Sequence, residues 1–153
     1  MILTAWKRRV SLMYLIDTNV ISEARKGRQA NIGVQTFFRS VAKQQNLAYL
    51  SVISIGELRR GLEKIRQRGE GKQALVLEKW LKNVLTHYKD YILDFDDEAA
   101  QVWGQLRVPH PEHALDKQIA ATALVYDLTV VTRNTQDFMP CGVKLHNPFT
   151  TKE

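Results

Sequence analysis

Three short apolar runs constrain the fold of this chain more than any other feature of its sequence. They are continuous rather than alternating, and they lie at Tyr14–Ile16, Leu47–Leu50 and Leu128–Val131. Such runs are typical of strands buried on both faces of a parallel sheet, because alternation appears only when one face meets water. Weaker runs at Tyr91–Leu93 and Val143–Leu145 predict two further short strands.

The segments between these runs have the apolar spacing that is typical of helices. Apolar residues recur every three or four positions in five stretches, and Asn, Ser or Asp marks several of their starts. The predicted helices are Asn31–Lys43, Ser54–Arg68, Lys72–His87, Asp96–Arg107 and Asp116–Tyr126. Strands that alternate with helices predict an α/β fold, here with a short central parallel sheet flanked by helices.

The length of 153 residues fits a single domain of this kind. We expect an extension at residues 1–12, disordered or arising from an upstream start codon, then a folded domain at 13–148 and a tail at 149–153. No apolar run reaches the roughly 18 residues that a membrane span requires. Cys141 is the only cysteine, which excludes an internal disulfide. A reducing, cytoplasmic location away from membranes is therefore expected.

Acidic and amide side chains follow or flank the apolar runs at four places. Asp17 directly follows the first run, and Asn134 follows the third, so both should reach the carboxyl edge of the sheet, where ligands bind. Asp116 shares a helical stripe with apolar residues, and Glu57 borders another stripe. Oxygen ligands gathered in this way suit Mg²⁺ or Mn²⁺ and indicate metal-assisted phosphodiester chemistry.

Helix capping is the alternative explanation of each acid. Ser54 with Glu57 fits a capping box, and Asp17 and Asp116 could themselves be caps. The segment Asn134–Asp137 is also cap-like. A single metal site is favoured, because independent caps would not explain why one acid lies on a buried stripe and another at a strand end.

The net charge of +6 is unevenly distributed. Residues 1–72 hold 14 Lys/Arg against 5 Asp/Glu, whereas residues 73–153 hold 8 against 11. Basic residues close to the first two acidic segments suit a phosphate backbone presented to a metal site. Solvated helix faces would explain the same runs without nucleic acid. These basic residues are Arg25, Lys26, Arg28, Arg59, Arg60, Lys64, Arg66 and Arg68.

Other kinds of site are disfavoured by their spacing. Gly69–Lys72 lacks the full pattern of a phosphate-binding loop. His110–His113 contains a proline and has no Cys or third His nearby, so a surface turn is favoured over a zinc site. The chain also has no Gly-x-Ser-x-Gly elbow of the common serine hydrolases.

The four acidic segments resemble motifs of the PIN-domain ribonucleases, specifically the VapC-type toxins of type II toxin–antitoxin pairs and their FitB-like relatives. The matching segments are Leu15–Ser22, Ser54–Gly61, Leu115–Ala123 and Val131–Phe138. Each motif is common alone, but four in this order with this spacing are specific. The resemblance covers residues 13–148.

This resemblance implies a Mg²⁺-dependent endoribonuclease, with Mn²⁺ as an alternative ion, that is inhibited by a cognate antitoxin and often forms a homodimer. It implies that Asp17, Glu57 and Asp116 are catalytic residues and metal ligands. The fourth position is open between Asp137 and Asn134, whose carbonyl oxygen can ligate but cannot act as a base. The number of ions, one or two, is also open.

Polar residues beside the acids complete the resemblance. Thr18, Asn19 and Thr132 resemble the residues that surround the metal ligands in the family. In the implied mechanism, metal ions polarise the scissile phosphate of RNA, lower the pKa of an attacking water and stabilise the leaving 3′-oxygen.

Two alternative functions remain open. The first is a catalytically weak PIN-like module that binds RNA or protein, and the second is a metal-dependent phosphohydrolase of small phosphoesters. The retained acids favour catalysis over binding alone, and the basic first half favours a polyanionic substrate.

Overall fold

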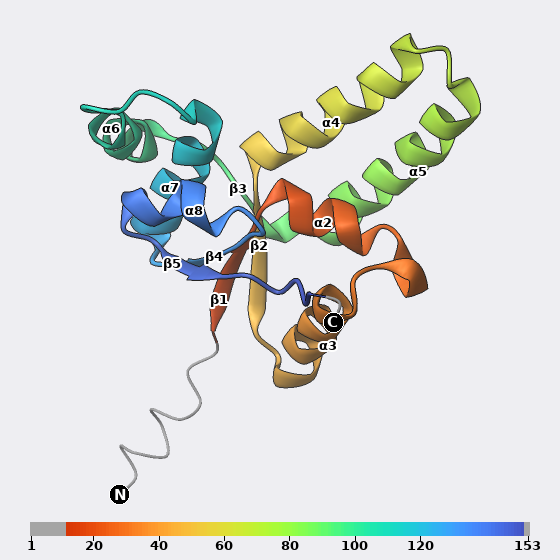
Figure 1. Cartoon of the computed structure of the whole chain (residues 1–153), viewed down its shortest axis with the longest axis horizontal. Coiled ribbons are helices and arrows are strands. Elements are labelled where there is room, and N and C mark those ends of the chain that lie inside the picture. The colour runs from red at the N-terminus through yellow and green to blue at the C-terminus, as the bar shows by residue number, and fades with distance from the viewer. Residues whose placement is uncertain (1–11, 152–153) are drawn as a thin grey trace, which may run out of the picture.

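A five-stranded parallel sheet forms the centre of the protein (Figure 1). The computed structural model describes residues 12–151. The strand order is β3-β2-β1-β4-β5, which confirms the predicted α/β fold. The strands are β1 (Met13–Ile16), β2 (Leu47–Ser51), β3 (Ile92–Leu93), β4 (Thr129–Val131) and β5 (Lys144–His146).

The central strand β1 pairs with β2 on one side and with β4 on the other. Leu15 aligns with Tyr49 and with Val130. Leu15 and Ile16 are both fully buried, although adjacent strand residues point to opposite faces. The sheet is therefore covered on both faces, as the continuous apolar runs predicted.

The five predicted helices are present, with two additional short ones. The additional helices directly follow strand ends, where four to seven residues are too few for a periodic pattern to be recognised. The helices are α2 (Thr18–Ala24), α3 (Ile32–Gln44), α4 (Val52–Gln67), α5 (Gly71–His87), α6 (Asp97–Leu106), α7 (Ala114–Tyr126) and α8 (Thr135–Phe138).

Two helix starts lie two residues before their predictions, and the other three differ by one residue. α4 begins at Val52, because the Ser51 side chain caps it by accepting a hydrogen bond from the Ile53 backbone N–H at 3.0 Å. α7 begins at Ala114 rather than at Asp116. The predicted starts at Ser54 and Asp116 were wrong because each was assigned to the polar residue nearest the apolar stripe.

Two hydrophobic cores hold the helices on the sheet. One joins Ile16 and Val131 to buried residues of α2, α3, α4 and α5, and the other joins Leu15 and Val130 to α7 and α8. Figure 1 shows α6, α7 and α8 gathered on one side of the sheet and α3 and α5 on the other. At the carboxyl edge of the sheet, β1 leads into α2 and β2 leads into α4.

The expected domain boundaries at residues 13 and 148 stay a prediction. β1 starts at Met13, whereas residues 1–11 of the expected extension lie outside the described residues. Beyond residue 148, Phe149 packs against the core that contains α3, and Thr150 bonds to Asn31. None of the helices within residues 12–151 is long and apolar enough to cross a bilayer.

Candidate active site

Asp17 is the most buried acid of the candidate site, with 4% of its surface exposed. Its Oδ1 accepts a hydrogen bond from the Thr18 backbone N–H at 2.8 Å and so caps α2. Its Oδ2 accepts hydrogen bonds from Thr132 Oγ1 at 2.7 Å and from Asn19 Nδ2 at 3.1 Å. Burial raises the pKa of Asp17, and these hydrogen bonds partly offset the rise.

Asn19 and Thr132 join the ends of β1 and β4 around this carboxylate. Asn19 Nδ2 also donates to Thr132 Oγ1 at 3.3 Å, and Asn19 Oδ1 accepts from the Arg133 backbone N–H at 3.1 Å. Thr18 contributes its backbone N–H, whereas its hydroxyl is buried and has no hydrogen-bond partner among residues 12–151. The three polar residues expected around the ligands thus lie at Asp17.

Asp116 is the third residue of α7 and is half-buried. Burial and then the charges of Asp17 and Asp137 raise its pKa to about 6. His113 lowers this pKa, and Glu57 raises it slightly. Because residue 113 occupies the cap position of α7, the interpretation of Asp116 as a cap was wrong. Its carboxylate instead lies in the electric field of three other acids.

Glu57 reaches the same region from the second turn of α4. The capping box expected from Ser54 and Glu57 was wrong, since Ser51 caps the helix and Ser54 lies inside it. The Ser54 hydroxyl is buried without a hydrogen-bond partner among the described residues. Glu57 is half-buried and lines a hollow between α2, α4 and α5.

Asp137 and Asn134 occupy different environments at α8. Asp137, Asp116 and His113 each have a potential ligand atom within 4.8 Å of the other two. Asn134 is exposed and precedes α8 without a side-chain cap bond, while its backbone N–H donates to Thr132 Oγ1 at 3.0 Å. Of the two candidates for the fourth position, Asp137 has a carboxylate oxygen within 4.8 Å of Asp116, and its charge raises the pKa of Asp116.

His113 is a residue of the site that the sequence interpretation left in a surface turn. Its Nε2 lies 3.9 Å from Asp137 Oδ1, and its backbone adopts a left-handed conformation with φ of 56°. The available signal was its position three residues before Asp116, which places both on the same side of a helix start. The preceding turn is exposed, as expected at His110.

The donor set of this site fits a hard divalent cation. Asp116 and Asp137 supply carboxylate oxygens within 4.8 Å of each other, and such oxygens suit Mg²⁺ and Mn²⁺. Asp17 and Glu57 lie outside this close group but near enough for their charges to raise the pKa of Asp116. The raised pKa of Asp116 follows from burial and from these same acids, and a cation would relieve the repulsion that contributes to it. The imidazole of His113 would favour Mn²⁺ over Mg²⁺ if it entered the coordination shell.

The basic residues near the site are not equally available to a ligand. Arg59 and Arg66 bond to Glu78 and Glu63, including a pair of bonds from Arg59 to Glu78 at 2.8 and 3.0 Å. Arg25 instead lines the hollow that contains Glu57. On α4, the positive charge expected to bind a polyanion is therefore partly neutralised, because Arg59 and Arg66 pair with glutamates.

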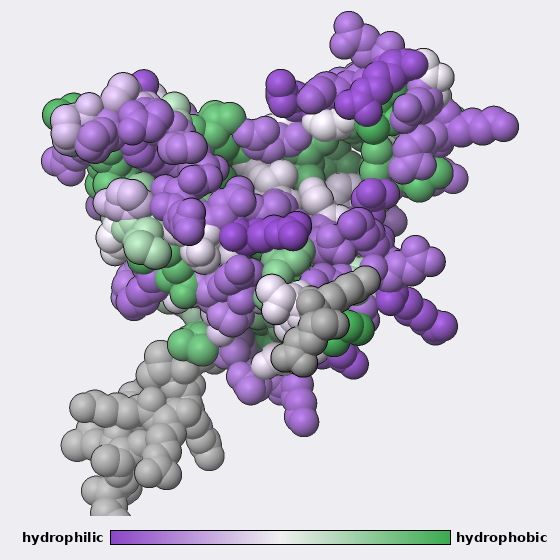
Figure 2. Space-filling model, in the orientation of Figure 1, coloured by the Kyte–Doolittle hydropathy of each residue, from purple (hydrophilic) through white to green (hydrophobic). Residues whose placement is uncertain are grey.

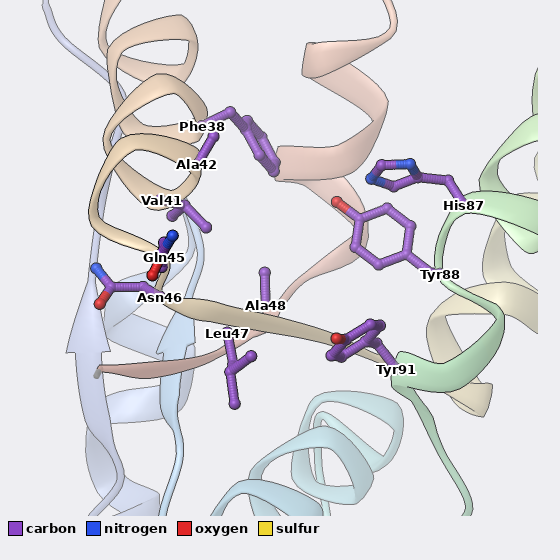
Figure 3. Close-up of a pocket in the computed structure, with 10 residues that line it drawn as sticks. All are labelled: Phe38, Val41, Ala42, Gln45, Asn46, Leu47, Ala48, His87, Tyr88 and Tyr91. Carbon is purple, nitrogen blue, oxygen red and sulfur yellow. The ribbon is translucent and has the colours of Figure 1, made fainter. Parts of the chain in front are cut away.

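Two hollows on the surface differ in whether a carboxylate lines them. The hollow beside Glu57 measures about 350 Å³ and has an apolar floor that includes Leu58 and Trp80. Figure 2 shows hydrophobic surface between the α4–α5 hairpin and α2. A second hollow of about 450 Å³ receives Phe38 from α3 and Tyr88 from the end of α5 (Figure 3). No carboxylate among the described residues lines the second hollow, so it is separate from the candidate active site.

The chain is similar to known proteins in both sequence and structure. A family model described as PIN domain matches residues 14–138. Toxin FitB of Neisseria gonorrhoeae (strain ATCC 700825 / FA 1090) is 36% identical over 143 residues, which cover 90% of this chain and 99% of that protein. VapC ribonuclease Y4jK of Sinorhizobium fredii (strain NBRC 101917 / NGR234) is 31% identical over 143 residues, which cover 90% of this chain and 98% of that protein. A solved structure of FitAB bound to an IR36 DNA fragment is similar with a TM-score of 0.77 and 33% identity, over 92% of this chain and 99% of that one.

Proposed function

The chain belongs to the PIN-domain family, and from that premise we propose that it is a metal-dependent endoribonuclease that acts as the toxin of a toxin–antitoxin pair. The observation that carries the proposal is the electrostatic coupling of acids from four separate segments near the carboxyl edge of the sheet, with ligand atoms of Asp116 and Asp137 within 4.8 Å of each other. Burial, together with the charges of the other acids, raises the pKa of Asp116 to about 6. Relatives named as a toxin and a ribonuclease support the same activity.

Each acid has a distinct role in this proposal. Asp17 and Asp116 hold a Mg²⁺ or Mn²⁺ ion, and Glu57 completes the set. Asp137 is the fourth acid, with Asn134 as the alternative ligand. A bound ion would polarise the scissile phosphate and lower the pKa of a water molecule. Thr132 and Asn19 fix the orientation of Asp17, since both donate hydrogen bonds to its Oδ2.

The activity is tested with single-stranded RNA and purified protein. We expect cleavage in millimolar Mg²⁺ or Mn²⁺, loss of cleavage with a chelator, and recovery when metal is restored. Asp116→Asn should lower the rate by about a hundredfold or more, because it removes charge from the ligand set. Asp127→Asn is the matched control, since Asp127 is exposed at the other end of α7 and pairs with Lys144.

Different results would favour the alternative functions. Cleavage that persists in chelator would refute the metal-dependent mechanism. Turnover of small phosphoesters without turnover of RNA would identify a phosphohydrolase. RNA binding without cleavage, in wild type and Asp116→Asn alike, would identify a binding module.

We propose that the antitoxin occupies the hollow between α2, α4 and α5. Its apolar floor suits one face of an amphipathic segment, and Glu57 at its wall would attract a cationic side chain of that segment. Trp80→Ala should therefore weaken antitoxin binding while metal-dependent cleavage continues. Equal antitoxin affinity of wild type and Trp80→Ala would exclude this hollow as the main docking surface.

A homodimer and a cytoplasmic location complete the proposal. Val108 and Leu115 are large hydrophobic residues with 76% and 50% exposure; Val108 follows α6, and Leu115 lies in the first turn of α7. Such exposure suits a contact between two copies. Light scattering of wild type and Leu115→Asp measures the oligomeric state, and a wild-type monomer at working concentration would refute the dimer.

A further inference from the structure

Arg133 lies beside the candidate active site and is fixed to it through the backbone. It directly follows Thr132, whose hydroxyl donates to Asp17. The Arg133 backbone N–H donates to Asn19 Oδ1 at 3.1 Å, and Asn19 in turn donates to the same carboxylate. The Arg133 backbone, from which its side chain extends, is therefore held at a fixed position relative to the acids.

An aromatic ring also fixes the Arg133 side chain. The guanidinium carbon lies 4.8 Å from the centre of the Phe149 ring. Phe149 packs against a hydrophobic core, and its backbone N–H donates to Asn147 Oδ1 at 3.0 Å. The stacked guanidinium thus rests on a ring that is itself anchored.

The segment that carries Phe149 is tied to the start of α3. Asn31 Oδ1 accepts from the Thr150 backbone N–H at 3.0 Å, and Asn31 Nδ2 donates to the Thr150 carbonyl oxygen at 2.9 Å. A Cβ atom added to Gly33 would lie 2.0 Å from the Pro148 carbonyl oxygen, so this close approach requires glycine. The ring beneath Arg133 therefore belongs to the folded domain.

Arg133 borders two polar hollows on this surface. Their volumes are about 420 and 510 Å³, and both are lined by Asn31, Arg133, Phe149 and Thr150. Asn147 adds a further amide to one of them. The hollows thus combine the Arg133 cation with several uncharged groups that can donate hydrogen bonds. Glu23 also lines the smaller hollow, and its carboxylate pairs with Lys26 at 2.9 Å and accepts a hydrogen bond from the Asn31 backbone N–H at 3.0 Å.

The charge of Arg133 is not neutralised by an ion pair within residues 12–151. Arg59 and Arg66 of the same protein each pair with two glutamates. A polyanion that approaches four acids needs a cation nearby, because the acids repel it. Arg133 is exposed and is fixed at this edge of the sheet.

We propose that Arg133, stacked on Phe149, binds a phosphate of the single-stranded RNA next to the bond that is cleaved. The planar guanidinium can donate two parallel hydrogen bonds to phosphate oxygens, and stacking limits the rotamer freedom that binding would otherwise remove. The inference rests on the proposed ribonuclease function and names a contact for its substrate.

The experiment measures RNA affinity as a function of salt concentration. Binding of a short single-stranded RNA is followed in Mg²⁺ by fluorescence anisotropy, with Asp116→Asn in every protein to prevent cleavage. Adding Arg133→Ala should weaken binding about tenfold, as expected for loss of charged hydrogen bonds. The slope of log K against log salt should fall by about 0.7, the value for one phosphate contact on a single strand. Arg133→Lys should keep this slope and recover part of the affinity.

Lys43→Ala is the charge-matched control. Lys43 is exposed in the last turn of α3, just before β2 begins, and therefore lies toward the amino edge of the sheet, opposite the acids. We expect the affinity and slope of this variant to match those of the parent protein. Equal losses in Lys43→Ala and Arg133→Ala would show a general charge effect and overturn the inference, as would loss of the slope in Arg133→Lys.

Cleavage by proteins with an intact Asp116 separates this inference from the proposed function. We expect Arg133→Ala to raise KM with a smaller effect on kcat, and to leave the melting temperature within a few degrees of wild type. Metal-dependent cleavage with unchanged KM and salt slope would refute the Arg133 contact alone. Unchanged RNA binding with weakened antitoxin binding would assign Arg133 to the protein partner and also overturn it. Absence of RNA cleavage by wild type would refute the function, and the binding slopes would still decide the role of Arg133.

Discussion

At the scale of single residues, the candidate site contains carboxyl groups whose negative charge is disfavoured by burial. Asp17 keeps a buried carboxylate because three donors bind its two oxygens. Asp116 has less support, and its pKa of about 6 reflects burial and neighbouring acids. A cation would satisfy both residues, since it offsets repulsion and replaces lost solvation.

The pKa of Asp116 predicts a dependence of stability on pH in the absence of metal. Its folded value of about 6 exceeds the ordinary value of 3.8. Between these values the unfolded chain loses its proton first, so stability should fall as pH rises from about 4 to about 6 and stay lower above that. Asp116→Asn lacks this loss. Relative to the mutant, wild type should lose on the order of 1 kcal/mol, a figure reduced for partial solvent screening.

Urea unfolding in chelator at several pH values measures this difference. Asp127→Asn serves as the control for a surface acid on the same helix. A constant gap between wild type and Asp116→Asn across pH 4–7 would show that the acids do not interact in this way.

Thr132 provides a second prediction at this scale. Thr132→Val removes the hydroxyl that donates to Asp17 at 2.7 Å and leaves a buried carboxylate with one donor fewer. We expect a loss of about 1–3 kcal/mol in the free energy of unfolding. Thr122→Val is the matched control, because among the described residues that buried hydroxyl bonds only to the Gln118 carbonyl oxygen of its own helix. Equal losses from the two variants would deny Thr132 a special role at Asp17.

At the scale of elements, the helix starts position the acids. Ser51 ends β2 and caps α4, which places Glu57 in the second turn beside α2. α7 begins at Ala114, which places Asp116 in the first turn and next to His113. The site thus depends on where helices begin as much as on which residues they contain.

The cap of α4 gives a prediction with an internal control. Ser51→Ala should destabilise the protein by about 1 kcal/mol, since it removes the acceptor for the Ile53 N–H. Ser54→Ala should be close to neutral or slightly stabilising, because the Ser54 hydroxyl is buried without a hydrogen-bond partner among the described residues. Thermal or urea unfolding compares the two. A larger loss from Ser54→Ala would restore the capping box that the sequence suggested.

At the scale of the whole molecule, the parallel sheet gathers the site. Asp17 follows β1, and the segment that contains Thr132, Arg133 and Asp137 follows β4, its neighbour in the sheet (Figure 1). Residues 115 positions apart therefore share a hydrogen bond. The same edge is where open parallel sheets bind their ligands.

Metal binding should therefore stabilise the entire domain. With Mg²⁺ or Mn²⁺ at about a hundred times its dissociation constant, wild type should gain about 2.7 kcal/mol. For a domain of this size that gain raises the melting temperature by about 5–10 °C. Asp116→Asn should lose most of the shift, and Asp127→Asn should retain it. An undiminished shift in Asp116→Asn would remove this residue from the metal site.

The sequence alone determined the architecture and most of the candidate site residues. Continuous apolar runs require strands buried on both faces, and a 3.6-residue period requires amphipathic helices, so both features can be recognised from local patterns. The positions of Asp17 and Thr132 followed from the same logic, because carboxyl ends of parallel strands meet at one edge.

The tertiary structure decided what depends on contacts between distant segments. Ser51 rather than Ser54 caps α4, since capping depends on backbone geometry that several nearby polar residues could satisfy. His113 approaches Asp137 through the packing of two helices, and Phe149 supports Arg133 because the C-terminal segment packs against α3. Local patterns carry no information on such pairings, whose energies arise only when the folded chain brings the partners together.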